Sequence, residues 1–221
     1  MIRPLRLGFI PLTLMLAGCS TAPAIPVAER VDLERFMGDW YVIANIPTFA
    51  EKGAHNAVES YRLDADGTIA TTFTFREDSF DGPERVMRPR GFVRDRESNA
   101  VWGRQFVWPI KAEYLIAHVD ADYTETIIAR SSRDYVWIMA RTPQIADADF
   151  ARLKQKVADL GYDMAKVERG RGAGDRAGRL ELLADLVDGE ARGQPRAGDR
   201  HRVADLEAAD ERQPHVGAAE V

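Results

Sequence analysis

Eight short segments rich in aromatic and β-branched residues follow one another through the middle of the chain, and each has the length of a β-strand. They span residues 40–46, 57–63, 68–75, 86–93, 99–107, 114–119, 124–129 and 135–140. The connections between them are mostly of hairpin length, which joins neighbouring strands in antiparallel pairs and leaves no room for crossover helices. The pattern predicts an all-β domain, either a barrel or a sandwich, and argues against a parallel sheet.

After Pro143 the apolar period changes from that of a strand to that of a helix. Asp147 is placed to cap this helix and Gly161 to end it. The apolar positions fall on one face, at Phe150, Leu153, Val157 and Leu160. One amphipathic helix after a run of strands is expected to pack on the outside of the sheet.

The N-terminus carries the features of an export signal. Arg3 and Arg6 precede an apolar run over residues 7–16, which leads to Gly18-Cys19. The run is too short for a bilayer span, which needs about 20 residues. The arrangement resembles the lipobox of bacterial lipoproteins, which implies that residues 1–18 are removed as a lipoprotein signal peptide and that Cys19 carries the lipid. A plain signal peptide with an incidental cysteine is the alternative.

The segments on either side of the strands and helix have a different composition. Residues 19–30 contain two prolines among small residues, which predicts a lipidated N-terminus with an extended linker. Residues 169–221 contain no aromatic residue and no lysine, which predicts a disordered polar extension. The folded domain is therefore expected to cover residues 31–168.

Composition excludes several classes of function. The chain has 221 residues, is 45% hydrophobic and has a net charge of -5, without a basic block that could follow nucleic-acid phosphates. The four histidines show no metal-ligand spacing, no Gly-x-Ser-x-Gly elbow occurs, and Cys19 is the sole cysteine. We expect no metal, no cofactor, no nucleic-acid partner and no catalytic residue.

Three motifs in order point to a family. Gly38-Asp39-Trp40-Tyr41 begins the first strand, Asp122-Tyr123 precedes the seventh and Arg141-Thr142-Pro143 follows the eighth. They resemble the three signature motifs of lipocalins. Residues 134–143 and the helix after them are especially similar to bacterial outer-membrane lipocalins, whose animal relative is apolipoprotein D. The resemblance implies an eight-stranded antiparallel up-and-down barrel with the C-terminal helix packed outside.

The resemblance also assigns roles to the motif residues. Trp40 is expected to close the floor of the barrel, with the Arg141 guanidinium lying across the indole in a cation–π contact. Gly38 permits close backbone approach at this floor. Asp122 and Tyr123 complete the structural motif.

An eight-stranded barrel is either filled by its own side chains or hollow enough for one small ligand. Strand alternation leaves both possibilities open, and the resemblance favours a cavity. Phe49, Phe80 and Trp108 fall in or beside connections near the expected open end. The predicted cavity residues are Val42, Ala44, Ala57, Glu59, Tyr61, Phe73, Phe75, Phe92, Trp108 and Tyr114.

The family's ligands are fatty acids and phospholipids, notably lysophospholipids, so the resemblance implies lipid storage or transport by a protein tethered to the outer membrane and facing the periplasm. The ligand's charged head would lie near the mouth, and Arg88, Arg90 or Arg104 could meet it. A homodimer is possible, although the chain departs from the bacterial pattern after Lys166. The alternative is an envelope scaffold that binds a protein partner at the barrel mouth.

Overall fold

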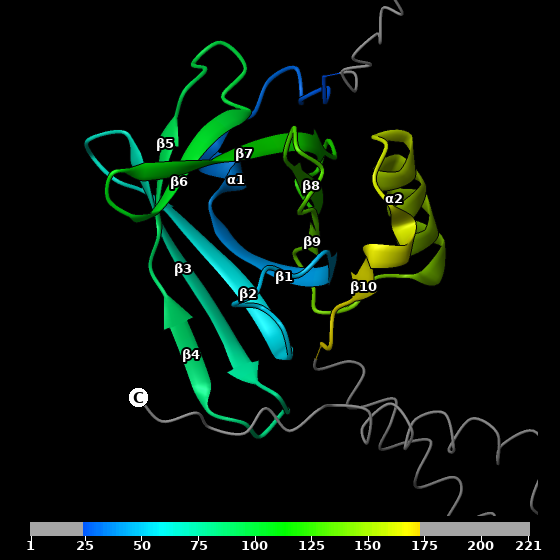
Figure 1. Ribbon diagram of the computed structural model, residues 1–221. Coiled ribbons are helices and arrows are strands. Elements are labelled where there is room, and N and C mark those ends of the chain that lie inside the picture. Colours follow the sequence, from blue (N-terminus) through cyan, green and yellow to red (C-terminus); the bar gives the residue numbers. More distant parts are fainter. Residues whose placement is uncertain (1–23, 173–221) are drawn as a thin grey trace, which may run out of the picture.

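The computed structural model describes residues 24–172, which form a closed antiparallel β-barrel with one long helix beside it (Figure 1). The predictions for residues 1–18, Cys19 and residues 173–221 lie outside the described residues. The helices are α1 (Leu33–Phe36), α2 (Asp147–Asp159) and the 3-10 helix η1 (Met164–Lys166). The strands are β1 (Gly38–Asn45), β2 (Ala54–Leu63), β3 (Thr68–Glu77), β4 (Glu84–Met87), β5 (Arg90–Val93), β6 (Val101–Val107), β7 (Ile110–Val119), β8 (Glu125–Ala129), β9 (Trp137–Ala140) and β10 (Glu168–Arg169).

The barrel is closed by pairing between its first and last long strands. Each strand pairs with the next from β1 to β3 and from β5 to β9, and β1 also pairs with β9, with Tyr41 opposite Ala140. Both β4 and β5 pair with β3, so together they form one barrel position, and the barrel has eight strands. This confirms the predicted up-and-down barrel and excludes the sandwich, because a closed sheet has no free edge.

The predicted strand 86–93 is interrupted in the structure. It divides into β4 and β5 at Arg88 and Pro89, which lie between the two paired stretches. Pro89 has no backbone N–H to donate to the ladder, although its carbonyl accepts a hydrogen bond from the Thr71 N–H at 3.2 Å. The break follows from the proline.

The strand directions give the barrel two different ends. At one end lie α1 and the connections 64–67, 94–100 and 120–124; at the other lie the connections 46–53, 78–83, 108–109 and 130–136. Asp32 caps α1 by accepting hydrogen bonds from the Glu34 and Arg35 N–H groups. This places Phe36 inside the barrel, where it is fully buried.

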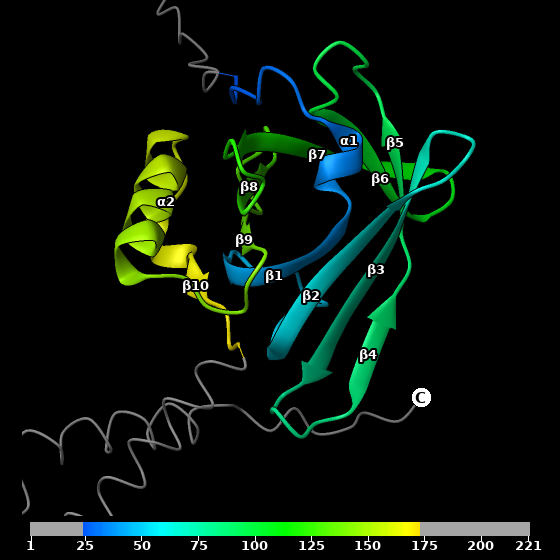
Figure 2. The ribbon, with the colours of Figure 1, turned by 180° about the vertical axis from the view of Figure 1, so that it is seen from behind.

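Two apolar clusters share the barrel wall. One fills the interior around Trp40, Phe36 and Tyr61, and the other lies between the outer face of the sheet and α2. Leu153 and Val157 of α2 are fully buried in the outer cluster, and the helix lies beyond β8 and β9 in two opposed views (Figures 1 and 2). The prediction of one helix outside the barrel is confirmed.

The sequence predicted the C-terminal end of α2 correctly and its N-terminal cap wrongly. Gly161, at φ +85°, follows the last turn and ends the helix as predicted. The prediction of an Asp147 cap is wrong, because Asp147 is the first helical residue and Ala146 occupies the cap position without a side-chain hydrogen bond. No described helix is long and apolar enough to cross a bilayer.

The folded part of the chain extends beyond the predicted domain, residues 31–168, at both ends. Ile25 is buried in the outer cluster and the Ala28 N–H donates to the Ile116 carbonyl at 2.9 Å, so residues 24–30 lie on the barrel and are not an extended linker. At the other end, β10 pairs with β1, and the Gly170 N–H donates to the Ile43 carbonyl at 2.8 Å. Residues 169–172 are therefore part of the domain, because backbone pairing compensates for their few apolar side chains.

Candidate ligand-binding site

Trp40 closes one end of the barrel. Its side chain is 0% exposed, and the indole Nε1–H donates to the Phe36 carbonyl at 2.8 Å. The Arg141 guanidinium lies 3.8 Å from the centre of the Trp40 ring. This cation–π pair has the geometry that the lipocalin resemblance implied, and it fixes the closed end from which the site is built.

The Arg141 guanidinium also joins three backbone segments. It donates hydrogen bonds to the carbonyls of Arg35 at 2.8 Å, Asp39 at 2.8 Å and Tyr123 at 3.1 Å. Gly38 has a φ of +91°, and a Cβ there would lie 3.4 Å from an Arg141 nitrogen. Glycine is needed at this position because the backbone is left-handed and the guanidinium is close.

The second motif contributes through Tyr123 only. The Tyr123 hydroxyl accepts a hydrogen bond from the Asp32 N–H at 2.8 Å, and the Arg35 guanidinium lies 4.3 Å from the ring centre. Asp122 is exposed. The carboxylate that orders this turn is Asp120, which accepts from the N–H groups of Thr124 and of the next residue at 2.7 Å each; sequence analysis missed it.

A layer of aromatic rings lies directly on this floor. The Phe36 ring is 5.7 Å from Tyr61 and 5.5 Å from Trp102, measured between ring centres. Trp102 in turn stacks on Tyr114 at 5.4 Å. Aromatic side chains therefore fill the barrel interior from the floor up to the hydroxyl groups of Tyr61 and Tyr114.

Beyond this layer the barrel is hollow. The cavity has a volume of about 450 Å³, in the range of small-molecule sites. It extends from Glu59, Arg104 and Tyr114 at the deep end to Phe49 and Val107, which are 87% and 69% exposed, at the open end. Its walls are mostly apolar. The remaining lining residues are Thr48, Ala50, Glu51, Phe73, Met87, Phe106, Ala112, Glu113, Arg130, Tyr135 and Trp137.

A buried polar cluster forms the deep end of the cavity. Arg104 donates a hydrogen bond to Glu59 at 2.6 Å, and the two side chains are 7% and 2% exposed. The Tyr61 hydroxyl donates to the other Glu59 carboxylate oxygen and lies 2.5 Å from the Tyr114 hydroxyl oxygen. A charge pair in such surroundings persists because each charge satisfies the other.

The protonation of this cluster follows from burial. Burial raises the pKa of the Glu59 carboxyl, an effect that Arg104 opposes by charge attraction and hydrogen bonding. Burial raises the pKa of the Tyr114 hydroxyl well above its ordinary value, so Tyr114 remains a neutral donor. Glu51, whose carboxylate accepts from the Trp137 indole at 3.1 Å, adds to the rise in the Glu59 pKa.

The structure brings seven of the ten predicted cavity residues to the barrel interior. Glu59, Phe73 and Tyr114 line the cavity itself. Tyr61 and Phe75 are buried beside it, with Phe75 5.3 Å from Phe73. Val42 and Ala57 border a smaller hollow next to β10, which shares Phe73 and Glu51 with the cavity.

Three predicted cavity residues lie elsewhere. Ala44 belongs to the outer cluster, because a register shift between Val42 and Ala44 reverses the alternation of β1. Phe92 lies outside the barrel under the Lys111 ammonium, 3.4 Å from the ring centre, since its neighbour Gly91 faces Trp102 inside. Trp108 is 82% exposed at the tip of the β6–β7 turn.

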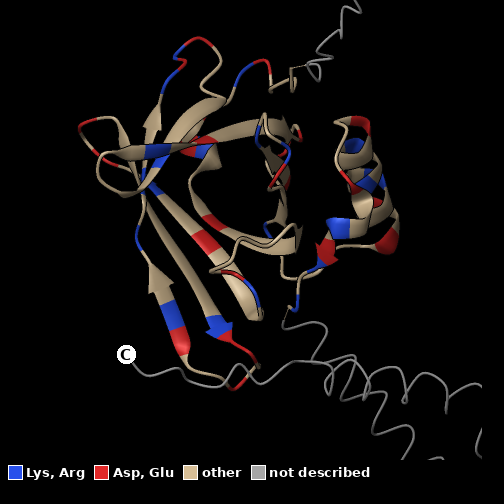
Figure 3. Ribbon diagram, in the orientation of Figure 1, with Lys and Arg blue, Asp and Glu red and all other residues tan. Residues whose placement is uncertain are grey.

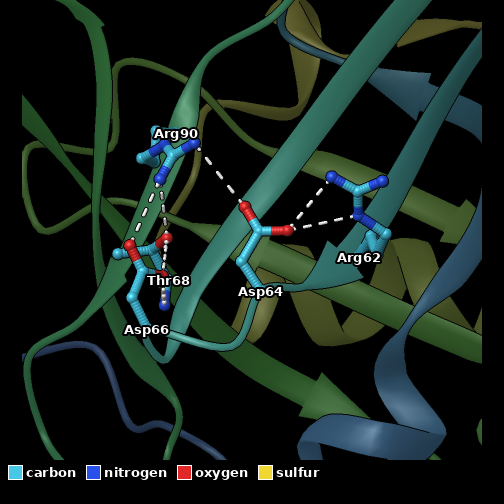
Figure 4. Close-up of polar contacts among 5 residues, drawn as sticks. All are labelled: Arg62, Asp64, Asp66, Thr68 and Arg90. Carbon is cyan, nitrogen blue, oxygen red and sulfur yellow. Dashed lines mark hydrogen bonds and ion pairs between the residues drawn. The ribbon is translucent and has the colours of Figure 1, made fainter.

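The three arginines proposed to meet a ligand head are separated. Arg104 lies at the deep end of the cavity, whereas Arg88 and Arg90 border a groove on the outside of the barrel. Arg90 is held there by Asp64, Asp66 and Thr68 in the network shown in Figure 4. Charged residues otherwise gather on α2 and near the strand ends, and much of the barrel wall is uncharged (Figure 3).

Sequence reasoning missed several lining residues at the open end. Arg130, Tyr135 and Trp137 come from the β8–β9 connection and the start of β9, and Glu51 comes from the long connection after β1. A signal for Trp137 was present, because it alternates with the inward-facing Met139. Phe80, predicted near the mouth, lies edge-on to His55 with ring centres 4.8 Å apart. Among residues 24–172, no three His, Cys, Asp or Glu side chains are grouped to hold a metal ion.

The family model of the lipocalin-like domain matches residues 31–171. The chain belongs to the lipocalin family. It is 29% identical over 152 residues to temperature-induced lipocalin-1 of Arabidopsis thaliana, an alignment that covers 65% of this chain and 80% of the plant lipocalin. It is 25% identical over 159 residues to outer membrane lipoprotein Blc of Escherichia coli (strain K12), covering 69% and 87%. Rat apolipoprotein D is 25% identical over 162 residues, covering 66% and 79%.

Solved structures with the same fold include insecticyanin from the tobacco hornworm Manduca sexta, with a TM-score of 0.54 and 13% identity, covering 67% of this lipocalin and 85% of insecticyanin. Lobster apocrustacyanin A1 has a TM-score of 0.51 at 12% identity, covering 68% and 91%. At such identities these similarities establish the barrel fold alone.

Proposed function

We propose that this lipocalin binds one fatty acid or lysophospholipid molecule, with the acyl chain inside the barrel, and that it stores or carries lipid at the outer membrane. The observation that carries the proposal is the apolar cavity of about 450 Å³, open between Phe49 and Val107. Each methylene that enters such a cavity gains about 0.8 kcal/mol. A single acyl chain therefore supplies enough free energy for tight binding.

The rim of the cavity suits a charged head group. Arg130 lines the cavity where β8 ends, on the open side of the barrel, and its side chain is 25% exposed. One of its terminal nitrogens lies 3.2 Å from Asp134, and the other has no hydrogen-bond partner among the described residues. A phosphate or carboxylate at the mouth would find a donor here.

The location rests on the N-terminal sequence and on a relative. Cys19 follows the apolar run of the signal, and a similar protein is named outer membrane lipoprotein Blc. We propose that lipidated Cys19 tethers the barrel to the outer membrane on its periplasmic side. Cys19→Ala is expected to move the protein from the membrane fraction to the soluble periplasmic fraction; continued sedimentation with outer membranes would contradict the tether.

Native mass spectrometry tests the ligand. The Cys19→Ala protein, purified from cells, is expected to carry a one-to-one adduct with the mass of a fatty acid or lysophospholipid, or to gain one when lysophospholipid is added. Absence of an adduct in both samples would contradict lipid binding and favour a scaffold that binds a protein partner at the mouth.

A matched variant connects the adduct to the cavity. Ala112→Trp places a large side chain in the cavity wall on β7, whereas Ala70→Trp places one on the outer groove beside Arg90. The cavity variant is expected to lose the adduct and the outer variant to keep it. Equal loss in both would assign the lipid to another surface.

A further inference from the structure

The deep end of the cavity presents a hydrogen-bond donor that the protein does not use. Arg104 is 6% exposed and lines the cavity, and its one side-chain hydrogen bond among residues 24–172 runs from Nη1 to Glu59, which leaves the Nη2 N–H groups without a partner. The guanidinium lies 5.1 Å from the Phe106 ring centre and 5.5 Å from that of Tyr114, and both rings line the cavity. An N–H group that lines an apolar cavity without a partner is unfavourable, so a ligand atom that pairs with Nη2 gains affinity.

The unpaired N–H groups of Arg104 can bind only a hydrogen-bond acceptor. A guanidinium has five N–H donors and no acceptor, so the ligand must supply an oxygen or nitrogen with a lone pair. A hydrocarbon end, such as the methyl terminus of an ordinary acyl chain, cannot do this. The deep end is therefore mismatched to a plain fatty acid that enters tail first.

The charge of the cluster selects against an anion at the same place. Glu59 already neutralises Arg104 at 2.6 Å, and Glu51 supplies a second carboxyl group that lines the same cavity. An ionised carboxylate or phosphate next to Arg104 would meet these like charges at low dielectric. A neutral oxygen accepts the hydrogen bond without adding charge.

We infer that this lipocalin prefers amphiphiles whose inner end carries a neutral hydrogen-bond-accepting oxygen, such as a terminal hydroxyl or ketone, which Arg104 binds at the deep end of the cavity. The inference rests on the proposed function, because it specifies which chains the same cavity takes. The cavity then recognises a ligand at both ends, with Arg130 at the rim and Arg104 inside.

Paired ligands on the unmodified barrel provide the direct test. Titration calorimetry with the Cys19→Ala protein compares omega-hydroxy fatty acids with plain fatty acids of the same chain length, over a series of lengths. At the length that spans the cavity, the hydroxylated acid is expected to bind about tenfold tighter, the value of one net hydrogen bond. If the deep end were apolar, the hydroxylated acid would bind more weakly than the plain acid, because its hydroxyl would be buried without a hydrogen-bond partner.

Equal or weaker binding of every hydroxylated acid, with plain acids still binding, overturns this inference and leaves lipid binding intact. This is also the outcome if a bound water satisfies Arg104 Nη2. Failure of both ligand series to bind contradicts the proposed function itself. The two failures are therefore distinguishable in one experiment.

A double variant assigns the preference to Arg104. Glu59→Gln with Arg104→Met removes the charge pair together, which avoids leaving one charge buried alone. It is expected to abolish the preference for the hydroxyl, measured as the ratio of the affinities of the two acids of equal chain length. Arg90→Met, on the outer surface, serves as the matched control and is expected to keep the preference. A preference that survives in the folded double variant, checked by its melting transition, also overturns the inference.

Discussion

At the scale of single residues, the closed end of the barrel depends on a few side chains with demanding geometry. Trp40 is fully buried, and Arg141 combines a stacked position over the indole with three hydrogen bonds to backbone carbonyls. The planar guanidinium of arginine can stack on the indole and donate these hydrogen bonds at the same time, whereas the ammonium of lysine cannot. The third lipocalin motif is therefore a structural requirement for arginine and not simply for positive charge.

Arg141→Lys is accordingly expected to destabilise the protein by about 1 to 3 kcal/mol, the value of charged hydrogen bonds lost at a partly buried site. Chemical denaturation measures the change. Arg90→Lys, on the outer surface at the same end of the barrel, is the control and is expected to have an effect within about 0.5 kcal/mol. Equal effects of the two substitutions would contradict a special role for Arg141.

At the scale of elements, the contact between α2 and the barrel wall places a histidine in an environment that disfavours its charge. Burial lowers the pKa of His118 on β7 below 6.5, and the positive charges of Lys156 and Arg152 on α2 lower it further, against Asp120 and Glu125. The His118 Nε2 atom is buried without a hydrogen-bond partner among residues 24–172. The folded state therefore binds this proton less readily than the unfolded chain does.

The sign of the pH dependence follows from this difference. Between the lowered pKa and 6.5, the unfolded chain carries more protons than the fold, so stability rises with pH and falls on acidification below about 6.5. Melting curves between about pH 7 and 5 are expected to show this loss, and His118→Gln to reduce it. An unchanged slope in the variant would contradict the assignment to His118.

At the scale of the whole molecule, the described fold extends beyond the barrel at both ends of the sequence. Residues 24–30 lie on the wall, and residues 168–171 pair along β1 and bond to Asn56, whose N–H donates to the Arg171 carbonyl at 2.8 Å. Residues 168–171 line the smaller hollow that borders the ligand cavity. The C-terminal segment is thus part of the wall near the site.

Two truncations test this boundary. Removing residues 173–221 keeps the hydrogen bonds of Gly170 and Arg171, whereas removing residues 169–221 eliminates them. The longer truncation is expected to melt several degrees below the shorter one, since a loss of about 1 kcal/mol lowers the midpoint of a domain of this size by about 2–4 °C. Identical midpoints would place the boundary at residue 168, as sequence composition suggested.

The strand pattern by itself allowed a barrel or a sandwich with one outer helix, and the resemblance carried by the sequence motifs implied the barrel and its floor. Those features follow from local periods and from motif residues such as Trp40, Tyr123 and Arg141, whose roles do not depend on fine strand register. The placement of cavity residues was less accurate, because one register shift moved Ala44 to the outer face and a glycine at 91 left Phe92 outside.

Only the tertiary structure decided that the barrel is hollow and what lies at its deep end. Glu59, Tyr61, Arg104 and Tyr114 come from three strands, and the sequence predicted Arg104 only as one of three candidates for the mouth. Their hydrogen bonds depend on how those strands pair and curve around the barrel. Strand alternation tells which face a side chain is on, whereas depth along the barrel and pairing across it are set by closure of the whole sheet.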